Sequence, residues 1–307
     1  MEKRNLGRSD LSVSKMGLGC MSLGTETAKA EKIIQTAFNE GINYFDTADL
    51  YDYGVNEKIV GKALASVREK VVIATKAGNR WNQDKNGWHW DPSKKYIKEA
   101  VKSSLKRLQT DYIDLYQLHG GTIDDPIDET IEAFEELQSE GLIKYYGISS
   151  IRPNVIREYA DRSSMISVMM QYSLLDRRPE EIMSLLAKKQ ISIVTRGSVA
   201  KGLLSDKMLG KKTEQWEGKQ FLDYSSAELK ELIESIQAKM LDDRRSLNEI
   251  ALQFNLAHEA VAAVVIGAST VEQVKDNVRA VYSPPLSKEE IAFLTMVTKE
   301  SRYLNHR

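Results

Sequence analysis

The sequence contains a single cysteine, Cys20, and only four histidines in 307 residues. One thiol cannot form a disulfide within the chain or build a cysteine-based metal site. The histidines, at positions 89, 119, 258 and 306, also lack the spacing of a metal-binding helix. We therefore expect neither a disulfide framework nor a metal site.

Excess charge and long apolar runs are also missing. The formal net charge is -1, which gives no general attraction for nucleic acid. The longest apolar run, AVAAVVIGA at positions 260–268, is much shorter than the roughly 18 residues of a membrane span. The start, MEKRNLGRSD, has no apolar signal core. We expect a cytoplasmic protein with a small-molecule partner and no nucleic-acid or membrane partner. No heptad seam indicates an oligomeric state.

Short β-rich segments instead recur along the whole chain. They lie at 13–20, 42–48, 71–78, 112–120, 143–150, 166–173, 191–198 and 260–269. Helical patterns separate most of them, for instance at 93–109 and 126–140. Strands that alternate with helices form a parallel sheet covered on both faces. This order predicts an α/β fold, a (β/α)₈ TIM barrel formed as a single domain by residues 1–307, with long loops at the C-terminal face of the strands.

The alternative is a doubly wound sheet, which normally has a G-x-G-x-x-G motif after its first strand. The corresponding stretch, GLGCMSLG, has Ser22 where the third glycine would stand. The barrel is therefore favoured.

In such a barrel the functional residues lie where the strands end. The second predicted strand ends at Asp46 with Tyr51 shortly after it, the third ends at Lys76, and the fourth ends at His119. Each residue alone has an ordinary interpretation: a turn cap, a packed aromatic ring, a solvated lysine, a core histidine. Three successive strands bring an acid, a base and hydrogen-bond donors to one rim. It is therefore less probable that all four ordinary interpretations hold at once.

These four groups suit one reaction. A lysine ammonium beside a phenol favours the phenolate, so Lys76 would make Tyr51 a better proton donor, while Asp46 holds Lys76 charged and in place. A tyrosine in this setting can protonate an alkoxide as it forms. Neutral His119 can orient a carbonyl oxygen by a hydrogen bond.

The segments around these residues resemble the aldo-keto reductase family. GINYFDTADLYDYGVNEKIVGKAL is similar to the family's signature around its aspartate and tyrosine, VVIATKAG to its lysine strand, and SLKRLQTDYIDLYQLH to its histidine strand. The resemblance implies a barrel enzyme that reduces aldehydes or ketones with NADP(H). It also implies a catalytic tetrad of Asp46, Tyr51, Lys76 and His119, with Tyr51 as the general acid.

The same resemblance implies a cofactor site assembled from several strand ends. Ser149 and Ser150 would hold the carboxamide, the segment TRGSVAKGLLSDK would contact the phosphates, and VVIGASTVEQVKDN would hold the 2′-phosphate and adenine. The predicted cofactor residues are Gly19, Cys20, Met21, Asp46, Ser149, Ser150, Gln171, Arg196, Gly197, Ser198, Val199, Ala200, Lys201, Gly202, Gly267, Ala268, Ser269, Thr270, Gln273 and Asn277.

The chain departs from the family pattern at several cofactor positions, including Ser150, where an asparagine is usual, and Ile266, where proline is common. Met169 stands where a glutamine is usual, and Gln171, on the same face of a strand, would partly replace it. Arg196 stands where many members stack an aromatic ring on the nicotinamide, and a planar guanidinium can stack as well. Gln273 stands where other branches have arginine, so Lys201, Lys207 or Lys275 would supply charge for a phosphate.

The loop after the lysine strand, NRWNQDKNGWHWDPSKK, carries Trp81, Trp88, His89 and Trp90 and is a candidate substrate wall. Packing of these indoles against a neighbouring loop is an equal alternative. Two other functions stay open: a cofactor-sensing subunit of a larger assembly, and a hydrolase that uses Asp46 and Asp49 as its acid and base.

Overall fold

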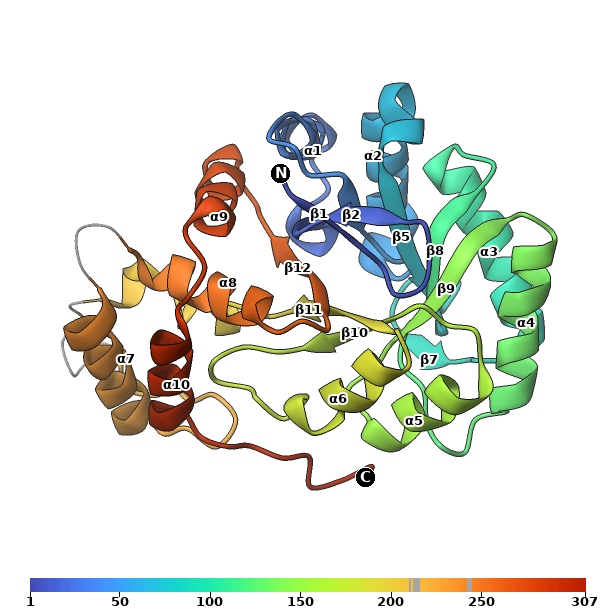
Figure 1. The fold of residues 1–307 in the computed structure, drawn as a ribbon. Coiled ribbons are helices and arrows are strands. Elements are labelled where there is room, and N and C mark those ends of the chain that lie inside the picture. Colours follow the sequence, from blue (N-terminus) through green and yellow to red (C-terminus); the bar gives the residue numbers. More distant parts are fainter. Residues whose placement is uncertain (210, 212–215, 242–244) are drawn as a thin grey trace.

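Eight parallel strands form a closed barrel surrounded by helices in the computed structural model, which describes residues 1–209, 211, 216–241 and 245–307 (Figure 1). Around the barrel, the strands are β3 (Met16–Gly19), β4 (Tyr44–Asp46), β5 (Val72–Ala77), β8 (Ile113–Leu118), β9 (Ile143–Ser149), β10 (Ser167–Gln171), β11 (Ser192–Arg196) and β12 (Val261–Gly267). β12 pairs with β3 and closes the ring, with Gly267 opposite Gly19. The predicted (β/α)₈ barrel is confirmed, and each predicted β-rich segment contains one barrel strand.

Helices follow the strands in the order expected of this fold. They are α1 (Thr27–Asn39), α2 (Val55–Leu64), α3 (Lys94–Leu108), α4 (Ile127–Ser139), α5 (Pro153–Arg162), α6 (Glu180–Lys188), α7 (Ser226–Met240), α8 (Leu247–Ala257), α9 (Val271–Tyr282) and α10 (Lys288–Val297). α7 and α10 pack against each other beside the barrel (Figure 1). No helix in the described ranges is both long and apolar enough to cross a membrane.

Local sequence signals explain where the predicted helices begin and end. The Ser93 hydroxyl accepts a hydrogen bond from the Tyr96 amide and caps α3. Pro126 precedes α4, and Gly141 follows it with a φ of 74°, a left-handed conformation that glycine adopts without strain. Both helices lie within one residue of the patterns at 93–109 and 126–140.

Two hydrophobic cores hold the barrel. The larger lies between the strands and the helices, and the smaller fills the barrel interior. An antiparallel hairpin of β1 (Lys3–Asn5) and β2 (Ser12–Ser14) contributes Leu6, Leu11 and Val13 to the interior core. Its Ser14 exchanges hydrogen bonds with Asn43, just before β4. The hairpin therefore closes the end of the barrel where the strands begin, which leaves the opposite end open for a site.

One close contact between neighbouring helices lies between α2 and α3. Gly61 of α2 is buried against the last turn of α3, where a Cβ atom on Gly61 would lie 2.5 Å from the backbone carbon of Leu108. A backbone neighbour cannot move aside as a flexible side chain can. The glycine is therefore required by close approach and not by a special backbone angle.

We expect Gly61→Ala to lower the free energy of unfolding by about 1–3 kcal/mol, because overpacking forces the two helices apart. The midpoint of urea unfolding measures the change. Lys58→Ala, on the exposed face of the same helix, is the matched control and should stay within about 0.5 kcal/mol of the parent protein. Equal midpoints for Gly61→Ala and the control would contradict this account.

Candidate active site

A cavity of about 1040 Å³ opens at the carboxyl ends of the barrel strands. Its wall contains the last residue of β3, β4, β9, β10, β11 and β12, namely Gly19, Asp46, Ser149, Gln171, Arg196 and Gly267. Tyr51 and His119, from the loops after β4 and β8, also line it. Three of the four residues predicted to act together therefore face one cavity, and Lys76 lies directly behind them.

Lys76 and Asp46 form a buried ion pair at this end of the barrel. Lys76 Nζ lies 2.6 Å from Asp46 Oδ1, and Lys76 is 1% exposed. The ammonium also donates to the carbonyl oxygen of Thr47 at 2.7 Å, while the Gln117 amide reaches Asp46 Oδ2 at 3.4 Å. A buried charge is tolerated only with such partners.

Burial by itself would lower the pKa of the Lys76 ammonium, but attraction by Asp46 and Tyr51 outweighs it, and the pKa of Lys76 is raised. Burial raises the pKa of the Asp46 carboxyl, and Lys76 opposes that rise. Because an ammonium ordinarily has a much higher pKa than a carboxyl, the proton stays on Lys76 at neutral pH.

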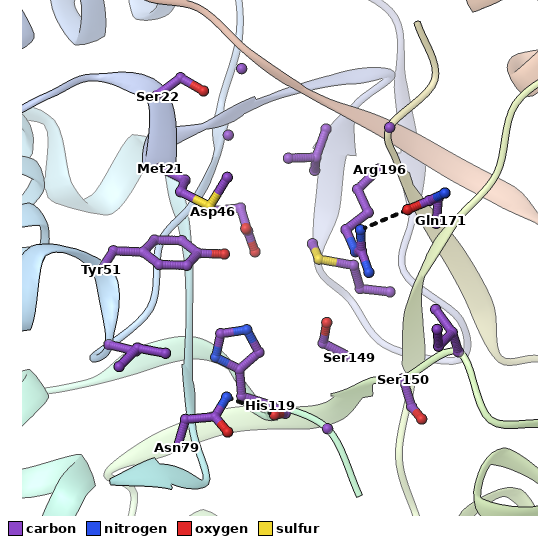
Figure 2. A pocket seen from close by; sticks show the side chains of 18 of the residues that line it. Met21, Ser22, Asp46, Tyr51, Asn79, His119, Ser149, Ser150, Gln171 and Arg196 are labelled. Atoms are coloured by element: carbon purple, nitrogen blue, oxygen red, sulfur yellow. Dashed lines mark hydrogen bonds between the residues drawn. The ribbon is translucent and has the colours of Figure 1, made fainter. Parts of the chain in front are cut away.

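Tyr51 and His119 lie close together at the cavity wall, with Asp46 near the Tyr51 hydroxyl (Figure 2). The Lys76 ammonium donates to the Tyr51 hydroxyl at 3.4 Å. The Tyr51 and His119 rings meet edge to face, with centroids 5.9 Å apart and planes at 83°. A ligand oxygen in the cavity beside them would therefore meet a phenol and an imidazole together.

His119 is held in its uncharged form. Burial lowers the pKa of its imidazole to about 3, and the positive charges of Lys76 and Arg196 act in the same direction. Its Nδ1 is buried and has no hydrogen-bond partner among the described residues, so Nε2 is the nitrogen available to a ligand. A neutral imidazole can donate one hydrogen bond without changing the charge of the site.

Most of the residues predicted for the cofactor face the same cavity. Those that line it are Gly19, Met21, Asp46, Ser149, Ser150, Gln171, Arg196, Gly197, Ser198, Val199, Lys201, Gly202 and Gly267. Those that lie outside its wall are Cys20, Ala200, Ala268, Ser269, Thr270, Gln273 and Asn277. Cys20 is fully buried in the core. The last five, from Ala268 to Asn277, continue from the end of β12 into α9.

The start of α9 is ordered by its own side chains. The Thr270 hydroxyl accepts a hydrogen bond from the backbone amide of Gln273 at 3.2 Å. The side-chain oxygen of Gln273, Oε1, accepts one from the backbone amide of Ser269 at 2.7 Å. Asn277 Oδ1 accepts from Asn248 at 3.3 Å. The first helical amides point out of such an N-terminus and favour an anion.

Gln171 uses its side-chain amide within the protein. Its Nε2 donates to Asp176 at 2.9 Å, and its Oε1 accepts from Arg196 at 3.2 Å, the bond drawn in Figure 2. Arg178 in turn donates two hydrogen bonds to Asp176, at 2.7 and 2.8 Å. Gln171 therefore orients Arg196 at the cavity wall, and Arg196 has no ion pair within the described residues.

The tryptophan loop was predicted either to form a substrate wall or to pack against a neighbouring loop, and its tryptophans differ in this respect. It folds into a hairpin of β6 (Asn79–Trp81) and β7 (Trp88–Trp90), and Trp88 and Trp90 line the cavity. Trp81 instead packs on Tyr53 and lies beside the Arg107 guanidinium, while His89 is outside the wall.

Several wall residues were not among the predicted catalytic or cofactor residues. They are Ser22, Leu50, Asn79, Gly120, Gly121, Thr122, Ile151, Arg152, Met169, Val265 and Ile266. All of them lie within three positions of a predicted residue, so a wider reading around each strand end would have found them. Asn79 donates to the backbone oxygen of His119 at 3.0 Å, a contact between loops that no local pattern indicates.

Asp49, the second acid of the hydrolase alternative, lies outside the cavity wall. It is 2% exposed, and its Oδ2 accepts from the Tyr96 hydroxyl at 3.1 Å. Asp49 is therefore not placed to act with Asp46 as the second carboxyl group of a hydrolase.

The structure defines a (β/α)₈ barrel with a cavity, lined partly by polar side chains, at the ends of its strands, and comparison with known proteins identifies its family. The sequence pattern of the Aldo/keto reductase family matches residues 15–299, so the chain belongs to that family. It is 57% identical to "Uncharacterized oxidoreductase YqkF" of Bacillus subtilis (strain 168), over 100% of both chains. It is 30% identical to the "NADH-specific methylglyoxal reductase" of Escherichia coli (strain K12), over 91% of this chain and 93% of that protein.

A solved structure supports the same family assignment. The holo form of aldo-keto reductase AKR11C1 from Bacillus halodurans superposes with a TM-score of 0.94 at 59% identity, covering 100% of this chain and 99% of that one. The predicted family is confirmed, and the chain is an oxidoreductase.

We expect the His119 imidazole to stay neutral from about pH 8 to about pH 5, because its folded pKa of about 3 lies far below the ordinary value of 6.5. Nuclear magnetic resonance of the ring measures this directly, with the signal assigned by its loss in His119→Asn. The unfolded chain takes up this proton near pH 6.5, so the unfolding free energy should fall as the pH drops from 6.5 towards 3. A His119 signal that titrates near pH 6.5 would contradict the expected environment.

Proposed function

We propose that the protein reduces aldehydes or ketones to alcohols with NADPH, using Tyr51 as the general acid. The observation that carries the proposal is the contact of one buried ammonium, Lys76, with both Asp46 and the Tyr51 hydroxyl. A phenol beside a permanent positive charge is suited to release a proton to an oxygen in front of it.

Each of the four residues has a separate task in this proposal. Tyr51 gives its hydroxyl proton to the carbonyl oxygen as that oxygen becomes an alkoxide. Lys76 stabilises the phenolate left behind, and Asp46 keeps Lys76 in place. His119 donates a hydrogen bond to the same oxygen, and its lowered pKa keeps it a neutral donor. Trp88 and Trp90 provide an apolar wall for the rest of the substrate.

The residues of the cavity fit a dinucleotide. Its volume of about 1040 Å³ lies at the upper end of the range for ligand pockets. Gly267 packs closely against Ser22, and a Cβ atom at this position would lie 2.5 Å from Ser22 Oγ, which would have to turn aside. Ser149 and Ser150 would hold the carboxamide, Arg196 would stack on the ring, and the segment from Arg196 to Gly202 would contact the phosphates. A bound nicotinamide supplies the hydride, which is chemistry of the cofactor.

The choice of NADPH rests on the start of α9 and on nearby lysines. The segment Gly267–Thr270 with Gln273 and Asn277 would surround the 2′-phosphate, which the first helical amides favour. Lys201 lines the cavity and supplies positive charge. The alternative is NADH, which the printed name of the Escherichia coli relative specifies for that protein.

We expect Tyr51→Phe to lower kcat for carbonyl reduction roughly a hundred- to ten-thousand-fold, because the ring stays and only the proton donor is removed. Steady-state kinetics with an aldehyde substrate measures kcat, and fluorescence titration measures the Kd for NADPH. The Kd should change less than about twofold, since the phenol acts on the substrate oxygen. Near-normal turnover in this variant would refute the assignment of Tyr51.

We expect NADPH to bind more tightly than NADH, and Gln273→Arg to increase that preference roughly tenfold, because a guanidinium fork at α9 matches the 2′-phosphate. Parallel fluorescence titrations with the two cofactors measure both values. Gln83→Arg, in the β6–β7 hairpin, adds the same charge outside the cavity wall and is the control. Tighter binding of NADH, or no effect of Gln273→Arg, would contradict the proposal that the start of α9 binds the 2′-phosphate.

A further inference from the structure

The backbone that follows Tyr51 is strained. Tyr51 begins a short 3-10 helix, Tyr51–Gly54, in which Asp52 and Tyr53 have φ angles of 48° and 51°. Gly54 continues in the left-handed region with a φ of 83°. Two residues with side chains in this region cost free energy and persist only when their surroundings hold them. Contacts on both sides of this turn therefore decide where the Tyr51 hydroxyl lies.

Asp49 holds the turn on the side before Tyr51. Its backbone amide donates to the carbonyl oxygen of Lys76 at 3.1 Å, which extends the pairing of β4 with β5 beyond the end of β4. Its side chain accepts from the Tyr96 hydroxyl at 3.1 Å, from the first turn of α3. One buried residue thus ties the turn to the strand of Lys76 and to a helix outside the barrel.

The same helix holds the turn on the side after Tyr51. Arg107 of α3 donates to Glu57 Oε2 at 2.6 Å, and the Thr75 hydroxyl donates to Glu57 Oε1 at 2.5 Å. The aliphatic part of Arg107 packs against Gly54, where a Cβ atom would lie 2.6 Å from Arg107 Cδ. α3 therefore contacts both ends of the turn, through Tyr96 and through Arg107.

The charges around Asp49 do not balance if it is ionised. The groups that face it are Glu57 from α2, Tyr96 and Arg107 from α3, Tyr116 from β8 and the backbone of Lys76 from β5. Arg107 is the single cation among these side chains, and it is already paired with Glu57, which is fully buried. Asp49 Oδ1 is buried and has no hydrogen-bond partner among the described residues. When two buried carboxyl groups share one cation, ionisation of the second carboxyl group is unfavourable.

The pKa of Asp49 agrees with this arrangement. Burial raises it to about 8 and Glu57 adds to the rise, while the Tyr96 hydroxyl and Arg107 oppose it. At neutral pH Asp49 is mainly a neutral carboxylic acid.

We propose that Asp49 is a positioning residue for the reduction assigned above, and that in its uncharged form it fixes the turn that presents the Tyr51 hydroxyl to the substrate. The inference rests on the proposed role of Tyr51. When Asp49 ionises, its carboxylate needs solvation that this position does not offer. The side chain then moves towards water and takes the turn with it, so Tyr51 leaves its position beside Lys76.

The effect of pH on stability has a definite sign. Unfolded Asp49 loses its proton near pH 3.8, whereas the folded protein keeps it to about pH 8. The folded state therefore binds the extra proton within this window, and the unfolding free energy falls as the pH rises from 3.8 to 8. Asparagine has a similar shape and does not ionise, so Asp49→Asn should lack this loss.

Asp49→Ala, Asp49→Asn and the parent protein test the proposal at about pH 7 and about pH 9.5. We expect Asp49→Ala to lower kcat about tenfold at neutral pH with an unchanged Kd for NADPH, and Asp49→Asn to restore most of that loss. At high pH the parent protein should lose more turnover than Asp49→Asn. Asp111→Asn, an exposed acid next to β8, is the control and should follow the parent protein.

Infrared spectroscopy gives a readout independent of turnover. The absorption of one protonated carboxylic acid should be present at pH 7, disappear with a midpoint near pH 8, and be absent from Asp49→Asn. Loss of this absorption below pH 6, or identical pH profiles of kcat for Asp49→Asn and the parent protein, would overturn the proposal.

If the Asp49 variants fail to fold, Tyr96→Phe replaces them. This variant should also lower kcat without changing the Kd for NADPH, and unchanged kcat would count against the proposal. If Tyr51→Phe retains turnover, the proposed function fails instead, and the infrared result still reports on Asp49 alone.

Discussion

The arrangement of the site depends on one buried contact, the ion pair of Lys76 with Asp46. Neither charge is tolerable alone inside the barrel, because each would lose its hydration without a partner. Adjacent parallel strands end side by side, so β4 and β5 bring the two groups to the same rim. Lys76, once fixed and charged, donates to the Tyr51 hydroxyl and adds to the burial that keeps His119 neutral. The chemistry of the rim is thus a consequence of strand order.

The parts predicted from sequence are those that short-range patterns determine. Apolar runs separated by helical periods were sufficient for the eight strands, and the polar residue after each run indicated the open rim. Asp46, Lys76 and His119 were found because each lies within one residue of the end of a strand. The order of the strands in the barrel then brings these residues to one rim, independently of the conformation of the loops.

The parts that were missed depend on contacts between distant segments. Asp49 was considered only as a second catalytic acid, because nothing near position 49 indicates that Tyr96 lies against it. Gln171 lines the cavity, but no local pattern indicates that its side chain is oriented by Asp176, which accepts hydrogen bonds and cannot donate them as a carboxylate. Trp81 resembles Trp88 and Trp90 in sequence, but it packs on Tyr53 and lies beside Arg107. Local patterns carry no information about such partners.

Three buried aspartates share one structural role around this cavity. Asp46 holds Lys76, Asp176 turns Gln171 so that its oxygen faces Arg196, and Asp49 ties the turn of Tyr51 to α3. In each case the acid accepts hydrogen bonds and is itself almost inaccessible to water. The three differ in their cations: Asp46 and Asp176 each have one at 2.6 or 2.7 Å, whereas the cation nearest Asp49 is paired with Glu57. Asp49 is therefore the member of the set whose charge state can change near neutral pH, and it is the one attached to the proposed proton donor.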